Sequence, residues 1–131
     1  MARNALVTPE ITAGEEFLKA SDEGGLRVRT AFWYFLPDAE QWRLFVASPV
    51  VDEGGPTAAY VEVQRVLEKL SSPAREALPL SEISVVSPTS ELPRLIGVAV
   101  QTTPDSSSPI RFKANTINGV YIDDAIIYRS T

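Results

Sequence analysis

The stretch Leu26–Ser48, LRVRTAFWYFLPDAEQWRLFVAS, decides the fold that this sequence predicts. It reads as two strands joined by a turn at residues 37–40, where proline and aspartate are typical turn residues. A four-residue turn gives apolar cross-strand pairs on one face: Phe35 with Trp42, Trp33 with Leu44, and Ala31 with Val46. Because side chains alternate along a strand, this face is expected to carry the main core.

The opposite face of the same hairpin combines aromatic rings with a charge. Phe32 is expected opposite Phe45, and Tyr34 opposite Arg43. An apolar sheet face needs a covering helix or a partner chain. Phe32, Tyr34, Arg43 and Phe45 are therefore the candidate partner-binding residues, for another protein or for a second copy of this chain.

The rest of the chain supplies helices and further strands. A capping sequence at Thr8-Pro9-Glu10 predicts a helix that ends at Gly24-Gly25. Further along, the patterns predict a series of shorter elements: a loop at 49–55, a helix from Pro56 to Leu70, a helical turn at 71–78, and a strand at 83–87. Segment 88–101 fits a helix through Leu92 and Leu95, but also a strand through alternating aliphatic residues; we take the helix.

A second hairpin is predicted near the C-terminus. Asn118-Gly119 is typical of a two-residue type I′ turn, and the serine- and proline-rich segment 102–109 before it is expected to be the most mobile connector. Pairing outward from the turn places Lys113 opposite Asp124. It also places Asp123 on the apolar face beside Ala125, and Ile122 on the other face.

These elements predict an α+β fold in one domain over residues 1–131. Its core is a single mixed, mostly antiparallel sheet of about five strands, made of two β-hairpins and one short strand, with two or three helices packed against it. The length is sufficient to bury such a core without disulfides or a metal.

Composition limits the chemistry that the chain can perform. The sequence has no cysteine and no histidine, which removes thiolate catalysis and the commonest general base and zinc ligand. A net charge of −5 argues against non-specific nucleic-acid binding, and the small basic group at Arg27 and Arg29, joined at most by Arg43, is interpreted as a solvated strand end. With no signal peptide or membrane span in the sequence, the expected location is the cytoplasm.

One alternative is a metal-dependent hydrolase or nuclease. Asp123 and Asp124, with Lys113 across the hairpin, are the candidate catalytic residues, and Asp52 or Glu53 could join Asp123 as oxygen ligands of magnesium. Neighbouring acids in a strand point to opposite faces, which weighs against a shared ion. No other cofactor is predicted.

A second alternative is a small-ligand binding domain with Trp33, Trp42 and Tyr34 lining an aromatic pocket. The reading that we favour is neither of these. Because the usual catalytic groups are missing, the sequence favours a small interaction or accessory domain over an enzyme, with a protein partner or homodimer contact on the partly apolar sheet face.

Overall fold

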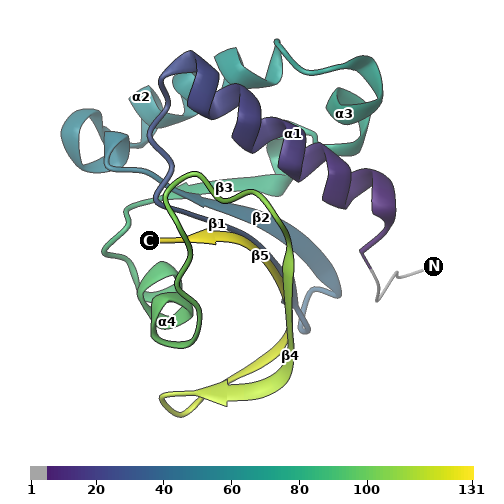
Figure 1. Ribbon diagram of the computed structural model, residues 1–131, viewed down its shortest axis with the longest axis vertical. Coiled ribbons are helices and arrows are strands. Elements are labelled where there is room, and N and C mark those ends of the chain that lie inside the picture. Colours follow the sequence, from purple (N-terminus) through teal and green to yellow (C-terminus); the bar gives the residue numbers. More distant parts are fainter. Residues whose placement is uncertain (1–5) are drawn as a thin grey trace.

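The first hairpin lies at the centre of a five-stranded sheet in the computed structural model, which describes residues 6–131 (Figure 1). The strands are β1 (Thr30–Leu36), β2 (Gln41–Ala47), β3 (Ile83–Val86), β4 (Ile110–Ile117) and β5 (Val120–Ser130). Their order across the sheet is β3-β2-β1-β5-β4. Only β3 runs parallel to its neighbour, so the sheet is mixed and mostly antiparallel, as the sequence predicts.

Helices cover both faces of this sheet. Figure 1 shows α1 (Thr8–Gly24), α2 (Val50–Leu67) and α3 (Ser72–Ala77) together on one face, and α4 (Glu91–Ala99) on the other. A short 3-10 turn at Leu80–Glu82 leads into β3. The predicted loop at 49–55 is mostly helical: α2 begins at Val50 and kinks at Gly55, whose φ of 84° only glycine adopts without strain. Pro56 starts the straight part of α2, as a proline at a first helical position does.

The main core lies between the central hairpin and the three helices on that face. The predicted pairs of Phe35 with Trp42 and Trp33 with Leu44 are confirmed. These side chains pack against Phe17 of α1 and other buried aliphatic residues of α2 and α3. The turn therefore fixes the register, and the register sorts the apolar residues onto one face.

A second core lies on the opposite face, beneath α4. The ambiguous segment 88–101 forms this helix, and its Leu95 and Ile96 pack against Phe32 and Tyr34 of β1. The buried residues of this segment, such as Leu95 and Ile96, follow the helical spacing. Val98, which fitted the alternative strand pattern, is exposed.

A β-bulge in β5 turns two consecutive side chains towards α1. Ala31 pairs with Arg129 but Phe32 pairs with Ile127, so Tyr128 is the extra residue. Tyr128 and Arg129 both reach α1, where they bind the Ile11 carbonyl and the Asp22 carboxylate. The simple alternation of a strand does not predict this arrangement.

A second irregularity curls the hairpin of β4 and β5 around α4. Ala114 has a φ of 50°, which breaks the alternation of side chains in the middle of β4. Ile122 therefore packs in the same core as Ala125 and Ile127, although the sequence analysis placed it on the opposite face. The prediction for Ile122 was wrong because alanine gives no signal of a left-handed backbone.

The connector 102–109 is tied to β5 at two residues, Thr102 and Ser106. The Thr102 backbone N–H donates to the Ser130 carbonyl at 2.8 Å, and the Ser106 hydroxyl donates to the Tyr128 carbonyl at 2.8 Å. The Arg129 guanidinium in turn donates to the Ser106 carbonyl at 2.9 Å. Of the three serines in this segment, Ser106 bonds to the sheet.

Candidate functional site

Asp124 is buried, and its ionic partner is not the predicted one. Lys113 pairs with Asp124 in the strand register, as expected. The ion pair, however, is made by Arg111, whose guanidinium donates to both carboxylate oxygens at 2.7 and 2.5 Å. This bond to Asp124 is the main reason that the pKa of Arg111 is raised. The fork of an arginine matches a carboxylate with two bonds, which the single ammonium of Lys113 does not provide.

Asp123 lies on the other face of β5 from Asp124 and is only half-buried. It is close enough to Tyr34 to contribute to the raised pKa of that phenol, although burial of the ring is the larger cause. The two neighbouring carboxylates therefore do not meet on one face, and they have different partners.

The acids that were considered as further magnesium ligands lie at the opposite end of the sheet. Asp52 accepts a hydrogen bond from the Ser87 hydroxyl at 3.1 Å, and Glu53 forms an ion pair with Arg27. Both belong to the start of α2, whereas Asp123 lies near the turn between β4 and β5. Within residues 6–131, no three carboxylates gather closely enough to hold a metal ion.

The predicted partner-binding face is mostly covered. Phe32, Tyr34 and Phe45 form one ring cluster, with Phe32 stacked on Phe45 at a centroid distance of 5.3 Å. Phe32 is fully buried, Tyr34 is nearly so, and only Phe45 keeps some exposure. α4 takes the place that the sequence analysis left for a partner.

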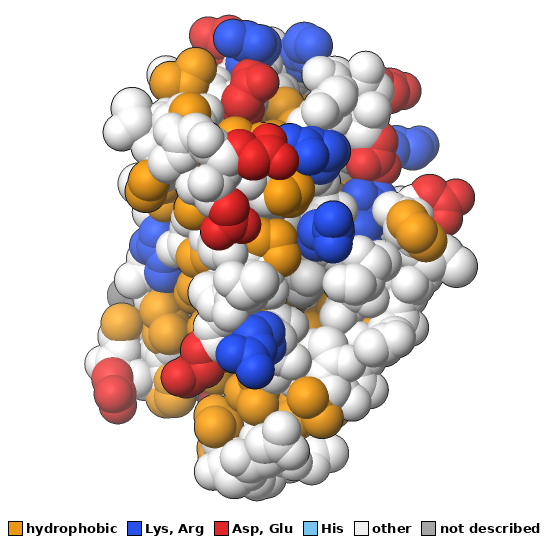
Figure 2. Space-filling model, turned by 90° about the vertical axis from the view of Figure 1, so that its left-hand side faces the viewer, with side chains coloured by type: hydrophobic (Ala, Val, Ile, Leu, Met, Phe, Trp, Pro, Cys, Tyr) orange, Lys and Arg blue, Asp and Glu red, His pale blue; other side chains and the backbone are white. Residues whose placement is uncertain are grey.

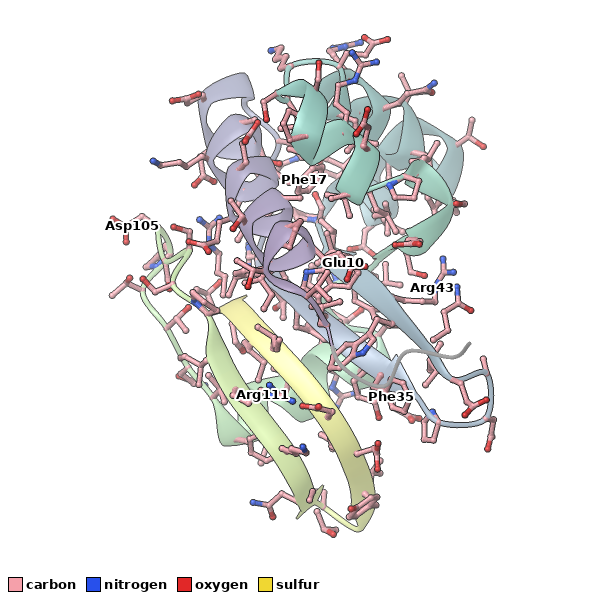
Figure 3. The ribbon with its side chains drawn as sticks, turned by 90° about the vertical axis from the view of Figure 1, so that its right-hand side faces the viewer. Glu10, Phe17, Phe35, Arg43, Asp105 and Arg111 are labelled. Carbon is pink, nitrogen blue, oxygen red and sulfur yellow. The ribbon has the colours of Figure 1, made fainter. Side chains whose placement is uncertain are left out.

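Arg43 connects neighbouring strands. Its guanidinium donates to the Ser84 hydroxyl at 2.9 Å and to the carbonyls of Ser81 and Ile83 at 3.1 and 3.3 Å. Figure 3 shows Arg43 at the outer edge of β2, well separated from Arg111 on the β4–β5 hairpin. These bonds give Arg43 a structural role in holding β3 to β2.

The three aromatic residues proposed for a ligand pocket do not line one cavity. Trp33 and Trp42 lie on the face of the sheet that α1, α2 and α3 cover, whereas Tyr34 lies on the face that α4 covers. The Trp33 indole N–H donates to the Tyr128 hydroxyl at 3.0 Å, and that hydroxyl donates to the Ile11 carbonyl at 2.7 Å. Trp33 thus belongs to a buried hydrogen-bond chain between the sheet and α1.

The structure reveals a different apolar surface, at the tip of the β4–β5 hairpin. Val98 of α4 is 61% exposed and Tyr121 of β5 is 59% exposed, the two highest values among large apolar side chains of residues 6–131; Val120 is also exposed. We call Val98, Val120 and Tyr121 the tip surface. Figure 2 shows hydrophobic side chains grouped at this lower end of the molecule.

A hollow of about 390 Å³ adjoins the tip surface, between α4 and the hairpin turn. Leu95 and Val98 form its apolar part, and Glu91, Arg94 and Asn118 form its polar part. The sequence alone does not reveal this site, because the site lies between segments about 20 residues apart and the curl at Ala114 that brings them together has no sequence signal. The only hint was Val98, an aliphatic residue outside the helical stripe.

Comparison with known proteins adds no relative: no family model, no curated protein and no solved structure matches the chain. No helix among residues 6–131 combines the length and the apolar character that crossing a bilayer requires. The fold and the tip surface therefore define the class of protein only as an α+β domain with one exposed apolar end.

Proposed function

We propose that this chain is a non-catalytic binding domain that holds a protein partner at the tip surface. The observation that carries the proposal is the position of the exposed apolar side chains. Val98, the most exposed of the large apolar residues described, lines a hollow together with Asn118, and the exposed Val120 and Tyr121 follow Asn118 at the same end of the molecule. Exposed apolar groups that gather around a hollow are typical of an interaction surface.

The state of the ionisable side chains supports binding over catalysis. The Asp124 carboxylate is fully occupied by Arg111, and Lys113 is exposed without forming the expected pair. Asp123 points to the other face. The three residues of the hydrolase hypothesis thus do not converge on a point where a substrate or an ion would sit, and geometry is the first requirement for an acid–base pair.

The chemistry of the hollow indicates what the partner presents. Leu95 and Val98 provide an apolar wall for an aliphatic or aromatic side chain. Arg94 is exposed and pairs with no carboxylate among residues 6–131, so it is available to an acidic or carbonyl group of the partner. A second copy of this chain is one such partner.

Free edge pairing is a less suitable mode of binding. β4 is an edge strand, but it carries Arg111 and Lys113 and is bent at Ala114. Charges and irregularities of this kind discourage another strand from adding to an edge. The partner therefore contacts the side chains of the tip surface rather than the backbone of β4.

The proposal is tested by affinity purification from cells that make the chain, with Val98→Asp compared with Val61→Asp. Val61 is an exposed valine of α2, on the other side of the molecule, and serves as the matched control. A protein that is recovered with the wild type and with Val61→Asp, but lost with Val98→Asp, supports the proposal. Equal recovery with both variants contradicts it. Sedimentation equilibrium of the three purified proteins shows whether the partner is a second copy.

A further inference from the structure

A hollow of about 310 Å³ lies at the far end of β5 from the tip surface, where β5 ends and β1 begins. Three arginines line it: Arg27 and Arg29 from the segment before β1, and Arg129 from β5. Pro104 of the connector lies on its border. In a protein with a net charge of −5, three arginines around one hollow are an exception to the overall balance.

Arg129 forms the fixed part of this hollow. Its side chain is only 1% exposed, and it donates to the two oxygens of Asp22 at 3.0 and 2.8 Å. The Ser106 and Val28 carbonyls accept further bonds at 2.9 and 3.3 Å. These four hydrogen bonds fix the position of the buried guanidinium, and the ion pair with Asp22 neutralises its charge.

Arg27 and Arg29 are the arginines that a ligand can engage. Arg27 pairs with Glu53, but both side chains are more than half exposed, and an exposed ion pair of this kind contributes little and exchanges readily. The Arg29 guanidinium has no ion-pair partner among residues 6–131. Its backbone is nevertheless fixed, because the N–H donates to Ala47 and the carbonyl accepts from Thr131.

Unpaired backbone donors add to the anion preference of the hollow. Within the described part of the chain, the backbone N–H groups of Arg27 and Val28 donate to no protein acceptor. Most backbone donors in folded proteins are paired, so an N–H group without a protein partner is free to bind an oxyanion or water. Leu26 and Val28 both pack in the main core, so the segment is extended and its successive N–H groups point to opposite sides; one of the two can serve the hollow.

Arginine side chains around the hollow outnumber the acidic side chains. Arg27, Arg29 and Arg129 carry three positive charges, Glu53 and Asp22 carry two negative charges, and the terminal carboxylate of Thr131, which also lines the hollow, carries the third. Arg43, which the sequence analysis joined to this group, lies elsewhere: Figure 3 shows it on the opposite side of the sheet from Asp105, the neighbour of Pro104.

We propose that this hollow binds a small molecule through its phosphate group. The guanidinium of Arg29, joined by Arg27 when it leaves Glu53, offers the forked donors that match phosphate oxygens. One of the N–H groups of Arg27 and Val28 supplies a further donor, and the volume of the hollow leaves room for a small organic group beside the phosphate. This site is separate from the tip surface and does not depend on a protein partner.

The test is calorimetric titration of the full chain with inorganic phosphate at low ionic strength. Arg29→Gln and Arg27→Gln remove one guanidinium each, and Arg75→Gln removes an exposed arginine of α3 as a matched control. We expect saturable binding by the wild type and by Arg75→Gln. Each of the other two variants is expected to bind about tenfold more weakly, the factor for one charge-assisted hydrogen bond.

Thermal unfolding of each variant confirms that it is folded, so that lost binding is not mistaken for lost structure. Amide chemical shifts provide the second readout and are expected to change at Arg27–Arg29 in the wild type. Malonate is titrated in parallel, because a carboxylate also fits an arginine fork. Three results overturn the proposal: no saturation at about 10 mM phosphate, where a site with a Kd of about 1 mM would be filled; equal loss with Arg75→Gln; or binding of malonate without binding of phosphate.

Discussion

Replacing Tyr128 with phenylalanine tests the hydrogen-bond chain that joins the sheet to α1. The hydroxyl accepts from the Trp33 indole at 3.0 Å and donates to the Ile11 carbonyl at 2.7 Å, in a side chain with no exposure to solvent. Tyr128→Phe keeps the ring but leaves the buried Trp33 N–H without a partner, whereas the Ile11 carbonyl keeps its bond within α1. An unpaired buried donor costs about 1–3 kcal/mol, so we expect a loss of about 1–3 kcal/mol in the free energy of unfolding.

Urea unfolding followed by far-UV circular dichroism measures this loss, and the fluorescence of Trp33 and Trp42 gives a probe close to the change. Tyr121→Phe is the control, because Tyr121 is exposed and its change is expected to stay within about 0.5 kcal/mol. If Tyr128→Phe is as stable as Tyr121→Phe, the hydrogen-bond chain does not hold α1 on the sheet, and the reasoning fails.

Three further predictions concern buried groups. Gly14→Ala is expected to destabilise the protein by about 1–3 kcal/mol in urea, although alanine favours a helix, because the added Cβ would clash with the Tyr128 hydroxyl. A more stable variant would contradict this. Arg111→Met leaves the buried Asp124 without its cation and is expected to lower the free energy of unfolding by about 2 kcal/mol, a loss limited by the partial exposure of Arg111. Lys113→Met is expected to change it by no more than about 0.5 kcal/mol. Equal losses of stability would favour the pairing of Lys113 with Asp124 that the sequence suggested. Burial raises the pKa of Tyr128, so the folded state keeps a proton that the unfolded state loses; this stability is complete below pH about 10 and falls above it by about 1.4 kcal/mol per pH unit. Because the pKa of Tyr34 is also raised, Tyr128→Phe should reduce the loss of stability with pH rather than abolish it, in unfolding measured against pH.

Much of the fold was predictable because local signals agreed with one another. The turn at residues 37–40 fixes the register of β1 and β2, and this register places Trp33 and Trp42 on the same apolar face. The Asn118-Gly119 turn fixes the second hairpin in the same way. Where turn chemistry and hydrophobic alternation point to the same pairing, a single sequence is sufficient.

The departures arise where the backbone leaves regular geometry or a long side chain reaches past its neighbour. Neither the bulge at Tyr128 nor the left-handed conformation of Ala114 has a glycine or asparagine to mark it, so the faces of β4 and β5 were only partly predicted. Arg111 reaches Asp124 diagonally, although the register pairs Asp124 with Lys113.

The candidate site was less predictable than the fold. The face at Phe32 and Tyr34 appeared open because the strand pattern of the central hairpin does not show that α4 covers it. The tip surface and the arginine hollow each combine residues from distant segments, and only the folded chain brings these residues together. Local sequence patterns therefore identified the residues of the core, but not the exposed surfaces at which a partner or ligand could bind.

The most direct measurement of the binding role is photo-crosslinking from the tip surface in cells that make the chain. A photoreactive amino acid is placed at position 98 in one protein and at position 61 in another, since both sites are exposed valines. A binding domain with its contact at the tip surface predicts a discrete crosslinked product from position 98, to a protein partner or a second copy, and none from position 61. The same products from both positions, or none from position 98, would contradict the proposed function.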